Sequence, residues 1–397
     1  MSDSPIVAAA SPGGLRQPGA LSRRYTHFGA LDLELGGRLD EVTVAYETYG
    51  RLNRDRSNAV LVLHALTGDA HAAGGTEPGQ QTPGWWDALI GPGKALDTDR
   101  WFVVSSNVLG GCQGTTGPSS LAPDGQPYGS RWPRITIRDQ VALEVRLADY
   151  LGIDRYALVA GGSMGGMRSL EWAVGHPTRL AAAWVGASTA AASADQIGTQ
   201  TTQIQAILGD PDWCGGDYQR EGRFPSNGLG LARRIAHLTY RTDEELDIRF
   251  GRDGQVGELP LAAPDVDSAY SGGHRYAVQS YLDHHAEKLV RRFDAGTYVA
   301  LTDAMNTHDI GRERGGVAAA LAGLSVPLIV AGVDSDRLYP LRQQAEIVES
   351  AATASELTVI ESPFGHDGFL IEVDAIGASL VGALGSLEAA NEAADCA

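Results

Sequence analysis

Tyr156-Ala-Leu-Val-Ala-Gly-Gly-Ser163-Met-Gly-Gly166 decides the fold of this chain, because its apolar run ends at a serine with glycines two residues before and two after. This spacing is typical of a nucleophile elbow, a tight turn between a buried strand and a helix that exposes the serine hydroxyl. The glycines let neighbouring backbone pass close to the turn without a Cβ clash. Residues 165–175 continue with helical spacing and stop at His176-Pro177, so we predict a helix whose N-terminus points at Ser163.

The glycines around Ser163 do not match either of two phosphate-binding loops. Ser163 stands where a dinucleotide-binding G-x-G-x-x-G would have its second glycine, and no G-x-x-x-x-G-K-[ST] occurs in the chain. The G-x-S-x-G pattern also has a non-catalytic interpretation, because a chain with 50 glycines contains chance matches. The catalytic interpretation therefore depends on what the rest of the chain supplies.

Length and composition indicate a large globular protein. The 397 residues, 43% of them hydrophobic, suffice for one α/β domain with an insertion or for two domains. A net charge of −18 disfavours nucleic acid and anionic membranes as partners, so an anionic cosubstrate would need a local basic patch. No apolar stretch reaches the roughly 18 residues of a membrane span, and no signal sequence is recognisable, which predicts a cytoplasmic protein.

The cysteines and histidines predict neither disulfides nor a metal site. Cys112, Cys214 and Cys396 are too few and too scattered for a disulfide framework or a zinc site, and no H-E-x-x-H pair occurs. Cys112 lies in a glycine-rich loop without the local signature of a nucleophile, so we expect a packed thiol there. We predict no metal and no cofactor.

A series of continuous apolar runs predicts a mostly parallel sheet, because such runs are typical of strands buried on both faces. The runs occupy residues 58–64, 101–105, 156–160, 181–185, 326–331 and 357–360. Helical segments lie between several of them, notably 137–151 and 341–352, so we predict a doubly wound α/β sheet. Residues 30–49 alternate apolar and polar side chains around Gly36-Gly37, which predicts an antiparallel hairpin at a sheet edge.

Residues 188–324 interrupt this alternation of strands and helices, because they contain helical patterns but no convincing buried strand. Their clearest helical patterns lie at 229–240, 276–293 and 297–305. An insertion at this point would fall over the carboxyl end of the sheet, so we predict a helical lid above Ser163. The predicted division is an α/β core of residues 23–187 and 325–385, a lid of residues 188–324, and loose tails at residues 1–22 and 386–397.

A serine hydroxyl becomes a good nucleophile when a base removes its proton, so a carboxylate and a histidine should follow in the order Ser, Asp, His. His366 lies in a glycine-flanked loop after the last predicted strand and is the expected base. The carboxylate is Asp334 or Asp336, which both follow the preceding strand, and the residues alone leave this choice open. Both loops belong to the carboxyl edge of the sheet, where the sites of such folds lie.

Two backbone N–H groups should stabilise the oxyanion that forms when the serine attacks a carbonyl. One belongs to Met164, directly after the nucleophile. The other comes from the turn after the strand at 58–64, where we choose Leu66. In other enzymes the loss of one such donor costs roughly 2.7 to 4 kcal/mol of transition-state stabilisation.

Four motifs together resemble those of the homoserine O-acetyltransferases, which are α/β-hydrolase-type enzymes of methionine biosynthesis. They are His64-Ala-Leu-Thr-Gly-Asp-Ala-His71, Asn107-Val-Leu-Gly-Gly-Cys-Gln-Gly-Thr-Thr-Gly-Pro118, Gly161-Gly-Ser-Met-Gly-Gly166 and Ser335-Asp-Arg-Leu-Tyr-Pro340. The resemblance extends from about Thr26 to Gly382. It implies an α/β-hydrolase fold and the transfer of an acetyl group from acetyl-CoA to L-homoserine through an acetyl-serine intermediate. We also expect a homodimer.

The resemblance also implies roles for three further side chains. The family's acid matches the aspartate of the S-D-x-L motif, which is Asp336. Its substrate arginine matches Arg233 in an A-R-x-I motif, and its substrate carboxylate matches Asp367, directly after His366. A guanidinium suits the carboxylate of homoserine, and an anion suits its ammonium group. Without the resemblance, the adjacent Arg234 would be an equal candidate.

Other functions of the same fold stay open as alternatives. A homoserine O-succinyltransferase or a serine O-acyltransferase would share these motifs, and a simple esterase would differ only in letting water resolve the acyl-enzyme. A non-catalytic binding protein is disfavoured because serine, aspartate and histidine are all present. Basic residues of the predicted lid, such as Arg241, Arg291 or Arg292, are candidates for contacts with the CoA phosphates, and the sequence does not choose among them.

Overall fold

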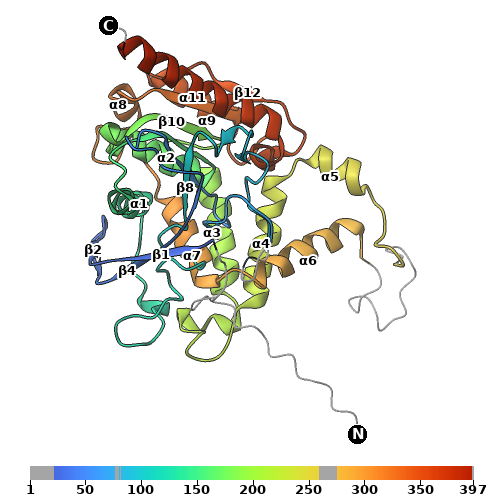
Figure 1. Ribbon diagram of the computed structural model, residues 1–397. Helices are drawn as coiled ribbons and strands as arrows, with labels where there is room; N and C mark the ends of the chain where they lie inside the picture. Colours follow the sequence, from blue (N-terminus) through green and yellow to red (C-terminus); the bar gives the residue numbers. More distant parts are fainter. Residues whose placement is uncertain (1–21, 77–79, 81, 259–274, 396–397) are drawn as a thin grey trace, which may run out of the picture.

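The computed structural model describes residues 22–76, 80, 82–258 and 275–395. One central sheet of eight strands has the order β1-β4-β8-β5-β9-β10-β11-β12 (Figure 1). The strands in this order are Arg24–Phe28, Val42–Tyr49, Phe102–Ser106, Ala59–Leu63, Tyr156–Gly162, Leu180–Gly186, Leu328–Val333 and Thr358–Ile360. From β8 to β12 all neighbours are parallel, whereas β1 with β4 and β4 with β8 are antiparallel. The predicted mostly parallel sheet is confirmed.

Helices cover both faces of the sheet. Helices α1 (Ile137–Leu151), α2 (Met164–Gly175) and α9 (Leu341–Ser350) contribute to one core cluster, and α11 (Val373–Asp395) contributes to the other. Strand β5 is buried throughout; Leu61 and Leu63 belong to the first cluster, and Val60 and Val62 belong to the second. Successive side chains of a strand point to opposite faces, and both faces of this sheet are covered by helices. Every residue of such a strand is therefore buried, which explains the continuous apolar runs in the sequence.

The predicted hairpin at residues 30–49 is wrong in its pairing. The residues before the Gly36-Gly37 turn form only β2 (Leu31–Asp32), which pairs with β3 (Arg38–Leu39) in a separate small sheet. Strand β4 instead pairs with β1 on one side and with β8 on the other. Alternation of side chains identifies a strand but not its partner, and here the partners are supplied by residues outside the hairpin.

The C-terminal residues differ from the prediction as well. Residues 386–395, expected in a loose tail, continue helix α11 to Asp395. The predicted N-terminal tail at residues 1–22 lies almost entirely outside the described residues. Within the described residues no single helix is long and apolar enough to cross a membrane; α11 passes such a test only together with residues 365–371, across a bend of 64°.

The described part of residues 188–324 is mainly helical and contains no named strand. Helices α4 (Ser226–Tyr240), α6 (Ala277–Val290) and α7 (Ala295–Asn306) lie where helices are predicted. Two further helices, α3 (Ala194–Leu208) and α5 (Asp243–Phe250), were not identified from the sequence. We call α3 to α7 the lid helices; α3 packs against α4 and α7, and α4 packs against α6 (Figure 1).

The remaining elements are β6 (Ile90–Gly91), β7 (Leu96–Asp97), α8 (Val317–Ala322), α10 (Gly368–Ile371) and the 3-10 turns η1 (Gly129–Arg131), η2 (Pro177–Arg179), η3 (Pro211–Gly216) and η4 (Gly365–Asp367).

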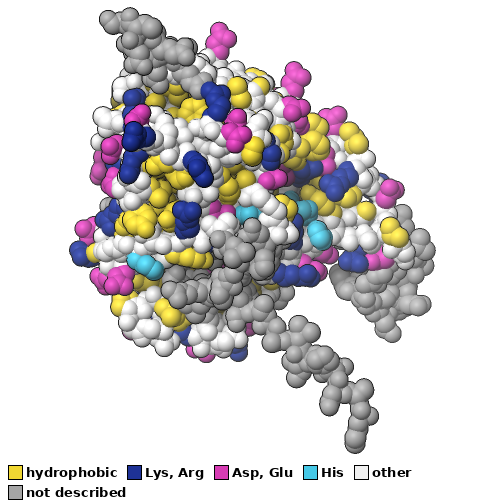
Figure 2. Space-filling model, viewed as in Figure 1, with side chains coloured by type: hydrophobic (Ala, Val, Ile, Leu, Met, Phe, Trp, Pro, Cys, Tyr) yellow, Lys and Arg dark blue, Asp and Glu magenta, His cyan; other side chains and the backbone are white. Residues whose placement is uncertain are grey.

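Charged side chains of both signs are interspersed over the face shown in Figure 2, and basic residues do not gather there into one large patch. With a net charge of −18, this face therefore offers no broad positive surface to an anionic ligand.

Candidate active site

Ser163 occupies the tight turn between β9 and α2, and its backbone is strained. Its φ of 58° and ψ of −124° lie in a region that residues with side chains rarely adopt. The turn is held because the Ser163 N–H donates to the Gly186 carbonyl over 3.0 Å. A Cβ on Gly165 would lie 2.0 Å from the Leu63 carbonyl oxygen, so only glycine lets the helix pass this close to β5.

His366 joins Ser163 to Asp336 in one hydrogen-bonded chain. Its Nε2 lies 2.9 Å from Ser163 Oγ and its Nδ1 lies 2.7 Å from Asp336 Oδ2, and all three side chains are buried. The other oxygen, Asp336 Oδ1, accepts hydrogen bonds of 2.8 Å from the N–H groups of Leu338 and Tyr339. The carboxylate is therefore held in place from both sides and in turn orients the imidazole.

Asp334 has a different partner. Its Oδ1 accepts a 3.0 Å hydrogen bond from the Ser362 N–H, so its carboxylate ties the loop after β11 to the loop that carries His366. The structure thus brings Asp336, and not Asp334, to the imidazole.

Three aromatic rings surround the His366 imidazole, and the sequence analysis did not identify them. Tyr339 is stacked on it at 5.0 Å between ring centroids, with Phe369 at 5.2 Å and Tyr240 at 5.7 Å. Tyr339 could have been found as the tyrosine of the S-D-R-L-Y-P motif, but Tyr240 comes from lid helix α4. A lid helix therefore contacts the catalytic imidazole and helps to exclude water from it.

Leu66 and Met164, the two predicted oxyanion donors, both lie close to Ser163. Leu66 and Ser163 line one small cavity, together with residues of α3, α4, α7 and the loop after β11. Its lining is Leu66, Ser163, Gln200, Gln203, Thr239, Tyr240, Met305, Leu338 and Tyr339. The Met164 N–H is at the N-terminus of α2, and no described group accepts a hydrogen bond from it or from the Leu66 N–H. Both donors are therefore free for a ligand.

The turn that carries Leu66 is fixed by the buried side chain of His64. The His64 Nδ1–H donates to the Ala65 carbonyl over 2.7 Å, and Nε2 accepts from the Val108 N–H over 3.1 Å. Burial lowers the pKa of His64 to about 3, so the ring is neutral and can act as an acceptor. The His64 carbonyl also accepts a hydrogen bond from Arg168 of α2. The oxyanion turn and the elbow helix are thus held together.

Arg233 and Arg234 lie side by side on α4 but have different surroundings. The Arg233 guanidinium lies 5.6 Å from the centroid of the Tyr240 ring, and its Nε and Nη1 atoms are buried without a hydrogen-bond partner among the described residues. Arg234 Nη2 is instead 2.7 Å from Asp283 of α6, and both of these side chains are about one-third exposed. Arg233 therefore has buried donors without a partner beside the aromatic shell of His366, whereas Arg234 is paired with a carboxylate at the surface.

Asp367 lies next to the catalytic histidine and is ion-paired within the protein. Its Oδ2 is 3.3 Å from Arg241 Nη1, and the Arg241 Nη2 and Nε atoms are 2.6 and 3.1 Å from the two oxygens of Glu245. Arg241 is buried in these contacts. Of the three arginines named as candidates for the CoA phosphates, Arg241 is thus already shared between two carboxylates, which disfavours it.

The other two arginines proposed for CoA differ in exposure. Arg291 is 75% exposed and pairs with Glu287 at 3.2 Å. Arg292 turns inward, where its Nη1 donates to the Thr67 carbonyl over 2.9 Å. Burial, followed by the positive charge of Arg233, lowers the pKa of Arg292.

Cys112 is a packed thiol, as predicted. Its Sγ accepts a 3.4 Å hydrogen bond from the Asp294 N–H, and burial raises its pKa to about 12, which leaves no reactive thiolate near neutral pH. In the described part of the chain no three His, Cys, Asp or Glu side chains gather as metal ligands would. The absence of a metal stays a prediction.

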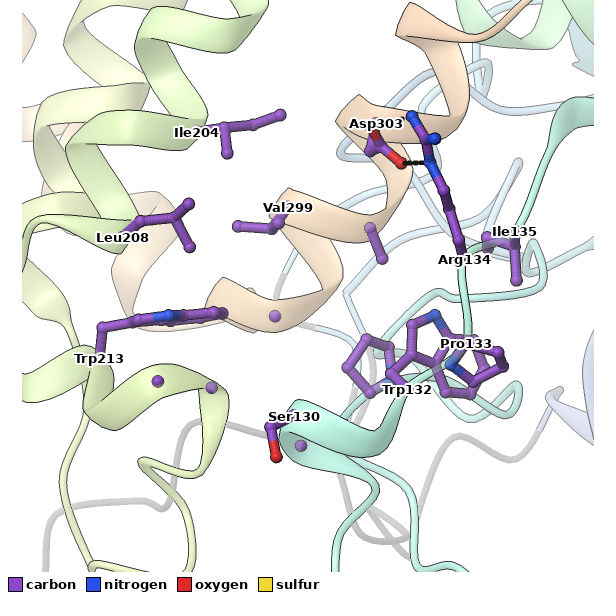
Figure 3. Close-up of a pocket in the computed structure, with 16 residues that line it drawn as sticks. Ser130, Trp132, Pro133, Arg134, Ile135, Ile204, Leu208, Trp213, Val299 and Asp303 are labelled. Atoms are coloured by element: carbon purple, nitrogen blue, oxygen red, sulfur yellow. Dashed lines mark hydrogen bonds and ion pairs between the residues drawn. The ribbon is translucent and has the colours of Figure 1, made fainter. Parts of the chain in front are cut away.

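A second hollow lies between α3, η3, α7 and the loop around η1, as Figure 3 shows. Its lining is mostly apolar, with Leu208, Trp213 and Val299, and an ion pair of 2.6 Å joins Arg134 to Asp303 at its side. No residue of the Ser163 chain of hydrogen bonds lines this hollow, so it does not belong to the candidate active site.

Known proteins resemble this chain over most of its length. Residues 58–373 match the family model described as the alpha/beta hydrolase fold. A homoserine O-acetyltransferase of Thermobifida fusca is 59% identical over 87% of this chain and 89% of its own. One from Mycobacterium sp. (strain KMS) is 57% identical over 88% of this chain and 91% of its own.

Solved structures agree with these matches. The homoserine O-acetyltransferase of Bacillus anthracis superimposes with a TM-score of 0.81 at 26% identity, covering 91% of this chain and 97% of its own. Esterase E22 superimposes with a TM-score of 0.82, also at 26% identity, covering 91% of this chain and 99% of its own.

Proposed function

The chain belongs to the homoserine O-acetyltransferase family, which has the α/β-hydrolase fold, and we propose that it moves an acetyl group from acetyl-CoA to the hydroxyl of L-homoserine. The product, O-acetyl-L-homoserine, would serve methionine biosynthesis. The observation that carries the proposal is the hydrogen-bonded chain from Ser163 through His366 to Asp336, which is the arrangement that a serine nucleophile requires.

In the first half-reaction Ser163 Oγ attacks the thioester carbonyl carbon of acetyl-CoA while His366 Nε2 takes the hydroxyl proton. Asp336 holds the Nδ1–H of the imidazole and stabilises the imidazolium that forms. The Leu66 and Met164 N–H groups hold the oxyanion. When it collapses, the C–S bond breaks, CoA leaves with the proton from His366, and an acetyl-Ser163 ester remains.

In the second half-reaction homoserine replaces CoA. His366 takes the proton of its hydroxyl, the hydroxyl oxygen attacks the acetyl-Ser163 carbonyl, and the proton returns to Ser163 Oγ as the product forms. CoA leaves before homoserine binds, and the acetyl group stays on Ser163 between the two half-reactions, so the cycle is ping-pong.

We assign the carboxylate of homoserine to Arg233, because two buried nitrogens of this guanidinium have no partner within the described residues. We assign its ammonium group to Asp367, which directly follows the catalytic histidine. Asp367 would then be shared between the ammonium group and Arg241, whose charge is already balanced in part by Glu245.

An esterase is the second candidate, because esterase E22 has the same fold at similar identity to the solved acetyltransferase. Water would then resolve the acyl-enzyme. Succinyl-CoA as donor and serine as acceptor are further variants of the same chemistry.

We also propose a cytoplasmic homodimer that needs no cofactor besides acetyl-CoA as its cosubstrate. The location is supported by the resemblance to homoserine O-acetyltransferases, which are biosynthetic enzymes. The dimer is supported by exposed apolar side chains on two lid helices, namely Ile197 and Leu208 on α3 and Leu231 and Leu238 on α4. Light scattering after size-exclusion chromatography measures the oligomeric state.

Two measurements test the reaction. Intact-mass analysis after mixing the protein with acetyl-CoA alone should show one acetyl adduct, which Ser163→Ala should lack. Initial rates over a grid of acetyl-CoA or succinyl-CoA against homoserine or serine should be highest for acetyl-CoA with homoserine and give parallel double-reciprocal lines. Intersecting lines without an adduct would contradict the ping-pong cycle, and acetyl-CoA consumption without O-acetylhomoserine would favour the esterase.

A further inference from the structure

Arg233 on α4 and Arg292 in the loop after α6 differ from the neighbouring arginines, because neither has a carboxylate as an ion-pair partner. Arg234, Arg241 and Arg291 each form an ion pair with an acidic side chain. Over the described ranges no carboxylate lies within ion-pair distance of Arg233 or Arg292. The Nε and Nη1 atoms of Arg233 and the Nε atom of Arg292 are buried and have no hydrogen-bond partner there. Buried guanidinium nitrogens without a hydrogen-bond partner are costly, so these two arginines point to an anionic ligand.

Both guanidiniums lie beside the catalytic centre. Arg292 Nη1 donates to the carbonyl of Thr67, the residue directly after Leu66 in the oxyanion turn. Arg233 lies against Tyr240, whose ring is 5.7 Å from the His366 ring. The charge of Arg233 contributes to lowering the pKa of Arg292, which places the two cations near each other.

The backbone of Arg292 is fixed as well. Its carbonyl accepts a 2.7 Å hydrogen bond from Gln113 Nε2, within the motif at residues 107–118. Residue 292 is thus held by two loops of the α/β core, one through its side chain and one through its carbonyl. Arg291, one residue earlier, points to solvent.

We propose that Arg292 is a specificity residue for the amino-acid substrate, sharing the homoserine carboxylate with Arg233, while its hydrogen bond to the Thr67 carbonyl holds the Arg292 side chain beside Leu66. The inference rests on the proposed function. In homoserine the carboxylate is only a few bonds from the reacting hydroxyl, whereas the phosphates of CoA are separated from the thioester by the whole pantetheine arm. Arg292, whose guanidinium contacts the residue directly after Leu66, would therefore meet the carboxylate and not a phosphate.

The test compares homoserine with 3-aminopropan-1-ol, which is homoserine without its carboxylate. Arg292→Gln keeps an N–H donor but removes the charge. Because a hydrogen bond between charged groups is worth about one to two powers of ten, kcat/KM for homoserine should fall about 10- to 100-fold. The rate with 3-aminopropan-1-ol should change little, so the preference for the carboxylate should shrink. Arg292→Lys should restore part of it, and Lys288→Gln, at an exposed lysine of α6, should leave both rates unchanged.

Several outcomes would overturn the role of Arg292. One is an equal loss with both substrates, which a purely structural residue would give. Another is an unchanged preference in both Arg292 variants. A third is loss of the acetyl adduct with acetyl-CoA alone, which would place Arg292 at the donor. If Arg292→Gln does not fold, Arg292→Lys decides, because it should keep the adduct and lower the preference. A wild-type protein that makes no O-acetylhomoserine would instead contradict the proposed function.

Discussion

At the scale of single residues, the site contains two pairs of identical residues that are close together in the sequence. In each pair the two side chains have different partners in the structure. Asp336 receives the imidazole and two backbone N–H groups, while Asp334, two residues earlier, receives one N–H group of a neighbouring loop. Arg233 has free nitrogens beside the site, while Arg234 pairs with Asp283. Each pair provides its own control, because the two substitutions differ only in which side chain is removed.

The first prediction concerns the orienting acid. Asp336→Asn should lower kcat on the order of 10⁴-fold, because the amide favours the wrong imidazole tautomer. Asp334→Asn keeps an oxygen that can accept from the Ser362 N–H, so its kcat should change far less. Steady-state rates with acetyl-CoA and homoserine measure both. A larger loss in the Asp334 variant would reverse the assignment.

The second prediction concerns the amino-acid clamp. Arg233→Ala should raise the KM for homoserine strongly and lower kcat, because a mispositioned hydroxyl attacks poorly. Acetylation of Ser163 by acetyl-CoA should survive, as intact-mass measurement would show. Arg234→Ala loses a partly exposed ion pair and should have little kinetic effect. Homoserine kinetics that are intact in Arg233→Ala would exclude this role.

At the scale of elements, a buried ion pair connects the elbow helix, the neighbouring helix and the oxyanion turn. Arg168 of α2 is fully buried, and its Nη1 lies 2.5 Å from Glu144 of α1. The second Glu144 oxygen accepts from Trp172 Nε1 over 2.8 Å, and Arg168 also donates to the His64 carbonyl. The pair therefore positions Leu66 only indirectly, through the turn in which it lies.

The third prediction follows from the cost of leaving one buried charge alone. Arg168→Met should lower the free energy of unfolding by about 3 to 5 kcal/mol, because Glu144 would stay buried without its cation. The double variant Arg168→Met with Glu144→Leu should recover part of this loss. Urea unfolding followed by tryptophan fluorescence measures both. If the double variant lost more free energy of unfolding than the two single variants together, this explanation would be contradicted.

At the scale of the whole molecule, burial keeps several histidines neutral. Burial is the main cause that lowers the pKa of His64 to about 3, of His237 to about 2 and of His308 to about 4. In the unfolded chain these rings would titrate near the ordinary value of 6.5. The unfolded state therefore binds more protons below that pH, and folded stability is lost as the pH falls from 6.5. The pKa of His71 is shifted in the opposite direction. Burial by itself would lower this pKa, but the hydrogen bond to Glu47 raises it. The stability that His71 contributes is therefore present at low pH and is lost as the pH rises above 6.5.

The fourth prediction is a steep loss of stability in mild acid. His285, whose pKa burial lowers to about 4, titrates in the same way as these three rings. Each of the four contributes a slope of up to about 1.4 kcal/mol per pH unit, so together they give up to about 5.5 below pH 6. His237→Phe should reduce this slope by about one quarter, because it removes one of the four rings. His27→Gln, on the exposed face of β1, should not change it. Urea midpoints between pH 5 and 7 test this, and an equal slope in His237→Phe would contradict it.

Much of the fold and site could be predicted because the signals are local. The elbow around Ser163 requires glycines at set spacings, and the buried strands appear as apolar runs of their own length. Helix α1 begins and ends where it was predicted, since the Thr136 and Asp139 capping box starts it and Gly152 in the left-handed conformation ends it. The order of Ser163, Asp336 and His366 along the chain is also a local property of successive loops.

Only the tertiary structure decided which groups meet. It paired β4 with β1 instead of β2, directed Arg233 toward Tyr240, and enclosed Arg241 between Glu245 and Asp367. Backbone preference and side-chain periodicity act over a few residues, so they set the type of an element and the side chains it carries. Strand pairing and ion pairing depend on groups that are far apart in the sequence. The spacing of residues within one segment does not predict which of these groups meet.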